Sequence, residues 1–289
     1  MLHLDLKSRR LENSDLPALN DMSRSVGWGY GEIYWKVILA SFTGIGVFDQ
    51  ENRLAGCIFV TDYGENRGNI GVLIVSKDHR GKGIASFLME QAENIVANGA
   101  GAVTLIATPD GTPVYTHRGY EVIGECHVLI RDTENASSPL PDLPGYRFTS
   151  ITEENMPDIL ALDHISFKAN RTHILYSLLK AADKTVALYN RETGELAGFG
   201  MLYRRADMKK LGPIVATTME EAVGIVQMLL YGMSDNVRMD VLSHQPDFIA
   251  KVSEFGFQTA DIDPVMVLRG DKSLIDCPQL FAIASQTLG

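Results

Sequence analysis

The pattern of apolar and polar positions is most informative between residues 72 and 95. Residues 72–75 form a continuous, mostly β-branched apolar run, which predicts a buried strand. A polar turn with glycines follows at residues 79–83. Apolar residues then recur at spacings of four, four and three, which predicts an amphipathic helix: Ile84, Leu88, Ala92 and Ile95. This stretch therefore predicts a strand, a glycine turn and a helix in succession.

The same periodicity predicts alternating strands and short helices along the first half of the chain. The predicted strands are 3–11, 44–48, 54–60, 69–75, 103–107, 120–124 and 127–131. The predicted helices are 13–22, 32–40, 84–95 and 113–118. Residues 132–145 contain three prolines and no periodicity, which is typical of a linker.

The pattern repeats after this linker. The predicted strands are 146–151, 186–189, 197–203, 211–215, 237–242 and 265–269, and the predicted helices are 152–163, 170–182, 217–231 and 246–255. Because the second half echoes the first element by element, we expect two tandem domains at 1–135 and 146–289, joined by a linker at 136–145. The predicted fold class is α+β, with strands and helices in each domain.

The glycine turn at residues 79–83 has the composition of an anion site. The first turn of a helix presents unpaired N–H groups, and the helix dipole favours negative charge there. Gly81 and Gly83 lack Cβ and allow close approach to the backbone, while Arg80 and Lys82 add positive charge. The spacing does not match a P-loop or a dinucleotide-binding G-x-G-x-x-G. The turn and helix therefore predict a pyrophosphate cradle of another kind.

Two motifs give this cradle a family resemblance. Arg80-x-x-Gly83-x-Ala85 after a strand resembles the R/Q-x-x-G-x-G/A signature of the GNAT superfamily of N-acyltransferases. A predicted strand at 103–107 follows, and Tyr115-Thr116-His117-Arg118-Gly119-Tyr120 is similar to the family's Y-x-x-x-G-F/Y ending. The two motifs stand in the order that a βαβ unit requires.

The resemblance implies two tandem GNAT-like domains, each a mixed, mostly antiparallel sheet flanked by helices. It also implies acetyl-CoA as co-substrate. By resemblance, the backbone of Leu73 and Val75 would hold the thioester carbonyl and the pantetheine arm. The amides of seven consecutive residues would hold the pyrophosphate: Arg80, Gly81, Lys82, Gly83, Ile84, Ala85 and Ser86. Thr108 stands where many relatives have an asparagine that touches CoA. Tyr115 occupies the position of the family's general acid, which protonates the departing thiolate; its alternative role is a core aromatic.

No sequence motif identifies the general base or the acceptor pocket. Relatives often carry a glutamate where this chain has Asn69, so Asp62 is the nearest alternative base, with a water chain as the other possibility. Trp28 and Tyr30 lie on the glycine-flanked loop that covers the acceptor side in GNAT folds, and we expect them to bind substrate or to pack on the sheet. From the second half, Arg171, Tyr203 and Arg205 are candidates to reach a carboxylate on the acceptor.

The second half lacks the cofactor motif. Its corresponding turn, residues 212–218, has no Arg-x-x-Gly-x-Gly/Ala, and Pro213 removes an N–H donor. Val252 replaces the tyrosine four residues before Gly256. We therefore expect a degenerate GNAT-like domain that completes the acceptor site or stabilises the fold.

Composition narrows the remaining possibilities. The net charge of −10 is shared evenly, with 12 basic and 17 acidic side chains in residues 1–135 and 14 and 19 in the rest, which argues against nucleic acid or an anionic membrane as partner. Three separated cysteines show no zinc spacing, so no metal is expected, and Cys57 reads as a buried thiol. With no apolar run of about 20 residues and no signal-peptide core, we expect a cytoplasmic protein.

The predicted function is acetyl-CoA-dependent N-acetylation of a small-molecule primary amine by direct attack. The expected state is a monomer or a homodimer. Two alternatives remain open: a non-catalytic acyl-CoA-binding sensor and a protein N-acetyltransferase.

Overall fold

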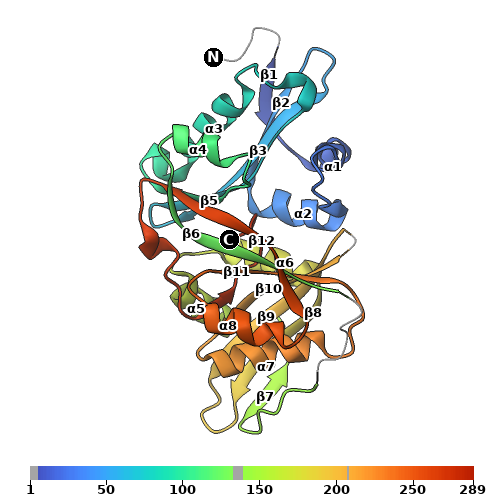
Figure 1. Ribbon diagram of the computed structural model, residues 1–289, viewed down its shortest axis with the longest axis vertical. Helices are drawn as coiled ribbons and strands as arrows, with labels where there is room; N and C mark the ends of the chain where they lie inside the picture. Colours follow the sequence, from blue (N-terminus) through green and yellow to red (C-terminus); the bar gives the residue numbers. More distant parts are fainter. Residues whose placement is uncertain (1–5, 133–138, 207) are drawn as a thin grey trace.

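The computed structural model describes residues 6–132, 139–206 and 208–289. Its strands form a single sheet of 13 strands, to which both halves of the chain contribute (Figure 1). Residues 3–5 of the predicted first strand and residues 136–138 of the predicted linker lie outside the described part.

The observed elements follow the predicted order closely. The strands are Lys7–Arg10 (β1), Thr43–Phe48 (β2), Leu54–Gly64 (β3), Arg67–Val75 (β4), Ala102–Ile106 (β5), Glu121–Arg131 (β6), Tyr146–Thr149 (β7), Ala182–Asn190 (β8), Leu196–Arg205 (β9), Met208–Ala216 (β10), Val237–Leu242 (β11), Phe257–Leu268 (β12) and Leu280–Ala282 (β13). The helices are Leu16–Ser25 (α1), Gly31–Ser41 (α2), Ile84–Ile95 (α3), Thr112–His117 (α4), Met156–Phe167 (α5), Thr172–Ala181 (α6), Met219–Leu230 (α7) and Pro246–Ser253 (α8).

The first half is a sheet with helices on both faces. Strands β1 to β5 lie in chain order; β1 to β4 are antiparallel, whereas β4 and β5 are parallel. Helices α3 and α4 lie on one side of this sheet and α1 and α2 on the other (Figure 1). The apolar stripe of α3 is buried as predicted, and the complete burial of Leu88 alone contributes about 2 kcal/mol.

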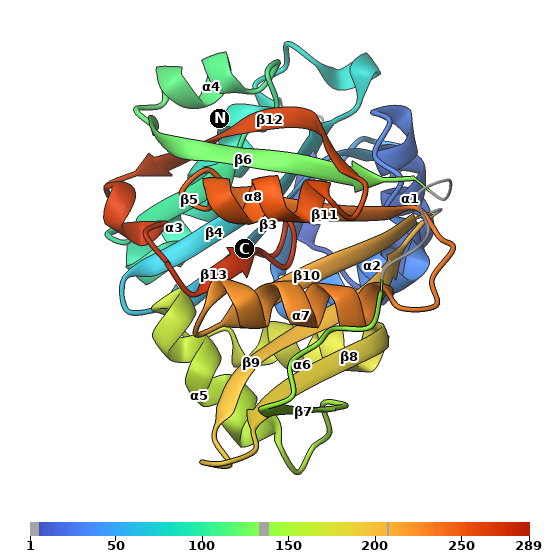
Figure 2. The same ribbon diagram turned by 60° about the horizontal axis from the view of Figure 1, so that its bottom comes forward.

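The two halves exchange a strand. Sequence pattern predicts a pair of short strands at 120–131, but the structure has the single long strand β6 there. Strand β12 of the second half lies between β5 and β6, and β6 in turn lies between β12 and β11 (Figure 2). Each half therefore closes its sheet with the other half's last long strand, which makes the sheet continuous.

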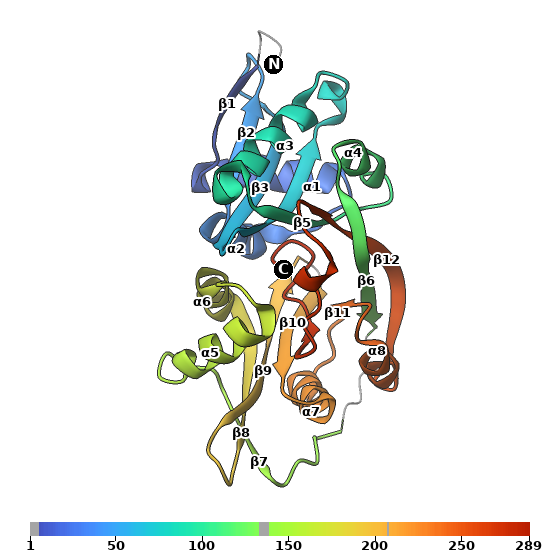
Figure 3. The same ribbon diagram turned by 90° about the vertical axis from the view of Figure 1, so that its left-hand side faces the viewer.

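The second half repeats the architecture of the first. Strands β7 to β11 lie in the same spatial order, and β10 and β11 are parallel. Helices α5 and α6 cover one face and α7 and α8 the other (Figure 3). Helices α2 and α6 pack against each other between the halves. The predicted α+β class, with mixed, mostly antiparallel sheets flanked by helices, is confirmed.

Candidate active site

A cavity of about 700 Å³ opens where β4 and β5 separate. These parallel strands pair only as far as Ile70 and Leu105, although β4 continues to Val75. The cavity is lined by the free part of β4 on one side and by residues 106–111 on the other. Side chains of the second half, including residues 286–287, complete the walls of the cavity. Strand ends of a split parallel pair are a common position for a ligand site.

The glycine turn lies at the mouth of this cavity. Gly81 and Gly83 both have a left-handed φ, +75° and +76°, and a Cβ at either position would meet nothing within 4 Å. Gly83 is the N-cap of α3, so the first amides of this helix have no intrahelical acceptor. The turn is exposed and Arg80 and Ala85 line the cavity. The cradle thus has the free backbone N–H groups and open space that a pyrophosphate requires.

The structure brings most of the predicted cofactor residues to one place. Leu73, Val75, Arg80, Ala85 and Thr108 line the cavity. Lys82 faces a neighbouring hollow beside Asp49, and Ser86 faces another hollow between α3 and α4. The side chain of Ile84 is buried in the core, so this residue offers only its amide.

Tyr115 lines the cavity from α4. Its ring packs edge-on against that of Tyr120, with centroids 5.9 Å apart. Burial raises the pKa of Tyr115 to about 12, so the hydroxyl stays protonated at neutral pH. A protonated hydroxyl in this position can donate a proton.

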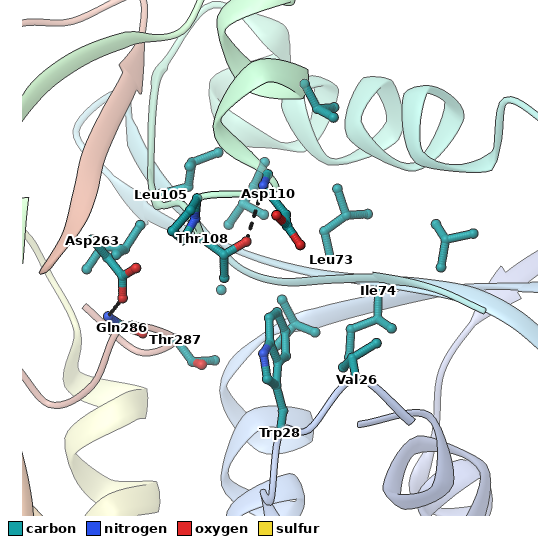
Figure 4. Close-up of a pocket in the computed structure, with 18 of the residues that line it drawn as sticks. Val26, Trp28, Leu73, Ile74, Leu105, Thr108, Asp110, Asp263, Gln286 and Thr287 are labelled. Atoms are coloured by element: carbon teal, nitrogen blue, oxygen red, sulfur yellow. Dashed lines mark hydrogen bonds between the residues drawn. The ribbon is translucent and has the colours of Figure 1, made fainter. Parts of the chain in front are cut away.

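Asp263 is a site residue that sequence reasoning missed. It lies on β12, and the carbonyl of the next residue, Pro264, accepts a hydrogen bond from Ala107 N–H at the end of β5 (3.0 Å). Asp263 is 6% exposed, and burial raises its pKa above the ordinary value of an aspartate. Gln286 Nε2 donates to its Oδ2 at 2.6 Å (Figure 4). A buried carboxylate with a raised pKa in a cavity has the properties of a general base.

The predicted base, Asp62, lies elsewhere. It is exposed near the β3–β4 turn, where its carboxylate accepts a hydrogen bond from Gly64 N (2.8 Å), and it is not among the cavity residues. Asn69 is buried and structural: its side chain donates to the carbonyl of Thr287 (3.1 Å). Asn69, which stands where relatives often carry a glutamate, therefore holds the segment around Thr287 against β4.

Trp28 and Tyr30 both line the cavity. Trp28 lies on the side opposite Thr108 and Asp110 (Figure 4). Their rings stack with centroids 5.8 Å apart. The Tyr30 hydroxyl is buried and lies 3.2 Å from Thr287 Oγ1. Trp28 is only half-buried, so its indole is the more available surface for an acceptor.

Of the three second-half candidates, only Arg205 lines the cavity. Arg171 is buried in an ion pair with Asp163 (2.7 Å) and donates to Gly289 O (2.8 Å). The Tyr203 hydroxyl donates to Ala284 O (2.7 Å). These two side chains hold the structure together and do not face the cavity.

The corresponding cleft of the second half is filled. Strand β13 pairs with β10 beyond the point where β10 leaves β11, with Ile214 opposite Ala282. At the N-terminus of α7, the buried Glu221 accepts hydrogen bonds from Thr218 N (2.8 Å) and the Tyr146 hydroxyl (2.8 Å). The chain's own strand and carboxylate thus occupy the two places that are open in the first half.

The split parallel strands, the glycine turn and the adjoining tyrosine are arranged as the resemblance to the GNAT acyltransferases implies. Two family models, each described as an acetyltransferase (GNAT) domain, match residues 36–128 and 159–282, which together make up most of the chain. The chain therefore belongs to the GNAT superfamily, with one such domain in each half, and is an N-acetyltransferase.

Three proteins are similar to this chain over nearly its whole length. The uncharacterized N-acetyltransferase YitH of Bacillus subtilis strain 168 is 25% identical over 97% of both chains. The structure of a proposed acetyltransferase from Pyrococcus horikoshii matches 100% of this chain and 98% of its own with a TM-score of 0.80 and 14% identity. A tandem GNAT protein of the clavulanic acid biosynthesis pathway matches 91% of this chain and 98% of its own, with a TM-score of 0.68 and 15% identity.

Three further observations concern the described residues. None of their helices is both long and apolar enough to span a membrane. They contain no cluster of three or more His, Cys, Asp or Glu side chains suited to a metal ion. Cys57, Cys126 and Cys277 are buried free thiols, as expected for Cys57.

Proposed function

We propose that this chain transfers the acetyl group of acetyl-CoA to a small-molecule primary amine by direct attack within the 700 Å³ cavity. The observation that carries the proposal is the meeting of three features in that cavity: the glycine cradle at its mouth, Tyr115 on one wall and Asp263 on another. Residues 1–135 would bind the co-substrate, and residues 146–289 would supply the base and the acceptor wall.

The proposed roles follow the chemistry of a thioester. The amides of residues 80–86 bind the pyrophosphate, and the free edge of β4 at Leu73–Val75 binds the pantetheine arm and thioester carbonyl. Asp263 takes a proton from the ammonium group, directly or through one water, and the neutral amine nitrogen then attacks the carbonyl carbon. As the C–S bond breaks, Tyr115 donates its proton to the thiolate, which leaves as CoA thiol, and the tyrosine recovers a proton from the acylated nitrogen through water.

Direct attack is favoured over an acyl-enzyme because no cysteine is among the cavity residues in the described part of the chain. Burial raises the pKa of the Cys57 thiol to about 12, which leaves it un-ionised and unreactive. A small acceptor is favoured because side chains of both halves and residues 286–287 surround the acceptor side.

We also propose that the second half does not bind acetyl-CoA. Its helix N-terminus is neutralised by Glu221 and its strand gap is filled by β13.

The test is turnover of acetyl-CoA with a panel of primary amines, followed by detection of N-acetylated product and free CoA. The proposal requires product with at least one small amine and loss of turnover, with retained CoA affinity, in Tyr115→Phe. Binding of acetyl-CoA without turnover on any amine would instead support a sensor. Turnover only on protein N-termini or lysines would support a protein acetyltransferase.

A further inference from the structure

Two arginines from the second half face the acceptor side of the cavity. Arg205 ends β9 and Arg238 lies on β11, and both are cavity residues together with Asp261, Asp263 and Gln286. Neither arginine takes part in the chemistry proposed above. Their hydrogen-bond partners show what this wall can bind.

Arg205 has no counter-ion among the described residues. Its guanidinium carbon lies 4.8 Å from the ring centroid of Tyr30 and 5.6 Å from that of Tyr34, so the two rings fix its position. Its Nε is buried and finds no hydrogen-bond partner in the described structure. A buried N–H group without a hydrogen-bond acceptor destabilises the fold, and a bound ligand that supplies the acceptor removes this penalty.

Arg238 is held from behind and leaves a donor free. Its Nε donates to Asp240 Oδ1 at 2.8 Å, whereas its buried Nη2 has no partner among the described residues. Asp240 is also engaged elsewhere, because it pairs with Lys210 Nζ (2.6 Å) and accepts from Gln286 N (3.1 Å). Since Asp240 and Lys210 are fully buried, this network holds Arg238 in place as a donor.

Two carboxylates, Asp261 and Asp263, line the same cavity as the two arginines. Asp263 is bonded to Gln286, and Asp261 precedes it on the same strand. The cavity therefore contains both carboxylates and guanidinium groups with unused donors. A ligand with one positive and one negative group would satisfy both sets.

We propose that the acceptor is an amine that also carries an anionic group, a carboxylate or a phosphate, which Arg205 and Arg238 bind through their free N–H groups. The ammonium end then faces Asp263, which takes its proton. This inference rests on the proposed function and names the substrate class of the same cavity. It also assigns a role to the second half, whose arginines select the acceptor.

The experiment compares acceptors that differ only in the anionic group. Suitable pairs are 4-aminobutyrate with 4-aminobutyramide, L-alanine with L-alaninamide, and glucosamine 6-phosphate with glucosamine. We expect kcat/KM to favour the anionic member of at least one pair by roughly ten- to a hundredfold, the range of hydrogen bonds to charged groups. The carboxylate and phosphate pairs show which anion is bound.

The variants are Arg205→Gln, Arg205→Lys and, as matched control, Arg204→Gln. Arg204 is the exposed neighbour of Arg205 on β9 and is not a cavity residue. Arg205→Gln should abolish the preference mainly through KM for the anionic acceptor, and Arg205→Lys should restore part of it. Arg204→Gln should retain the preference. Circular dichroism and acetyl-CoA affinity establish that each variant is folded.

Several outcomes would overturn the inference. Equal kcat/KM values within every pair would overturn it and leave the proposed function intact. A preference for the anionic acceptor that survives in Arg205→Gln would have the same meaning. A second arm compares succinyl-CoA with acetyl-CoA: a faster reaction with succinyl-CoA that requires Arg205 would mean that the arginines bind the acyl group and not the acceptor.

A binding arm separates this inference from the proposed function. The same pairs are titrated by calorimetry in the presence of CoA. Binding of the anionic members alone, lost in Arg205→Gln, supports the inference even if no turnover occurs, and the absence of turnover then counts against the proposed function. Equal binding or no binding of the members of every pair overturns the inference.

Discussion

The side-chain amide of Gln286 donates a 2.6 Å hydrogen bond to Asp263, so residues near the end of the sequence hold the carboxylate that we assign as general base. The backbone N–H of Gln286 donates in turn to the buried Asp240. Thr287 completes this arrangement, since its carbonyl accepts from Asn69 on β4. The segment at residues 286–287 therefore links the co-substrate strand of the first half to the proposed base of the second.

Asp263→Asn tests the base. We expect kcat/KM to fall by about a hundredfold or more, because general base catalysis contributes this much. Since burial raises the pKa of Asp263, the acid limb of the wild-type pH profile should lie above the ordinary range of an aspartate and should vanish in the variant. The measurement is kcat/KM against pH, with the exposed Asp235→Asn as control. If the acid limb of the pH profile is unchanged in Asp263→Asn, Asp263 is excluded as the base.

The raised pKa of Asp263 also predicts how Asp263→Asn changes the stability of the fold. A carboxyl whose pKa is raised in the folded state stabilises the fold below its unfolded pKa and loses this contribution as the pH rises through the folded pKa. At neutral pH the ionised Asp263 is therefore unfavourable to the fold. We expect Asp263→Asn to keep or raise the unfolding midpoint at pH 7, measured by urea denaturation. A lower midpoint would show that the ionised carboxylate is instead structurally required.

Tyr115→Phe tests the general acid. The hydroxyl of the partly buried Tyr115 is protonated at neutral pH, and its loss should lower kcat by about a hundredfold while leaving the affinity for acetyl-CoA unchanged. Turnover is measured by release of free thiol and affinity by calorimetry. The exposed Tyr176→Phe on α6 is the control. An equal loss of affinity and turnover in Tyr115→Phe would mean that the hydroxyl binds the co-substrate and does not act as the general acid.

Gly83→Glu tests the cradle. The substitution places a carboxylate at the N-terminus of α3 and a Cβ on a residue with φ of +76°, so it should repel the pyrophosphate and abolish acetyl-CoA binding. Gly194→Glu is a matched control, because Gly194 is exposed, has φ of +74° and also has nothing within 4 Å of a Cβ. Calorimetry should show one site in the control and none in Gly83→Glu. Binding that survives in Gly83→Glu would place the co-substrate elsewhere.

The cradle could be predicted from sequence because its chemistry is local. The glycines, the basic residues and the helix stripe lie within one short stretch, and their roles depend on the backbone around them. Asp263 could not be predicted, since residues 261–264 read Asp-Ile-Asp-Pro, a composition that disfavours a strand. Periodicity predicts strands at 120–124, 127–131 and 265–269 near the ends of the two halves, but it does not reveal that the first two form one long strand or which strand pairs with which. Asp62 was a poor candidate for the same reason: it lies near the β3–β4 turn, whereas the cavity opens where β4 and β5 separate, and the sequence does not reveal that separation.

Glu221→Ala tests the closure of the second half. Its carboxylate caps α7 through Thr218 N and accepts from the Tyr146 hydroxyl, so its loss should lower the free energy of unfolding by about 1–3 kcal/mol. Glu220→Ala in the same turn removes an exposed acid and should change stability much less. Calorimetry on Glu221→Ala should still give one acetyl-CoA per chain, because β13 continues to fill the gap beside β10. A second site in this variant would mean that Glu221 alone blocks a cofactor cleft that the second half has otherwise retained.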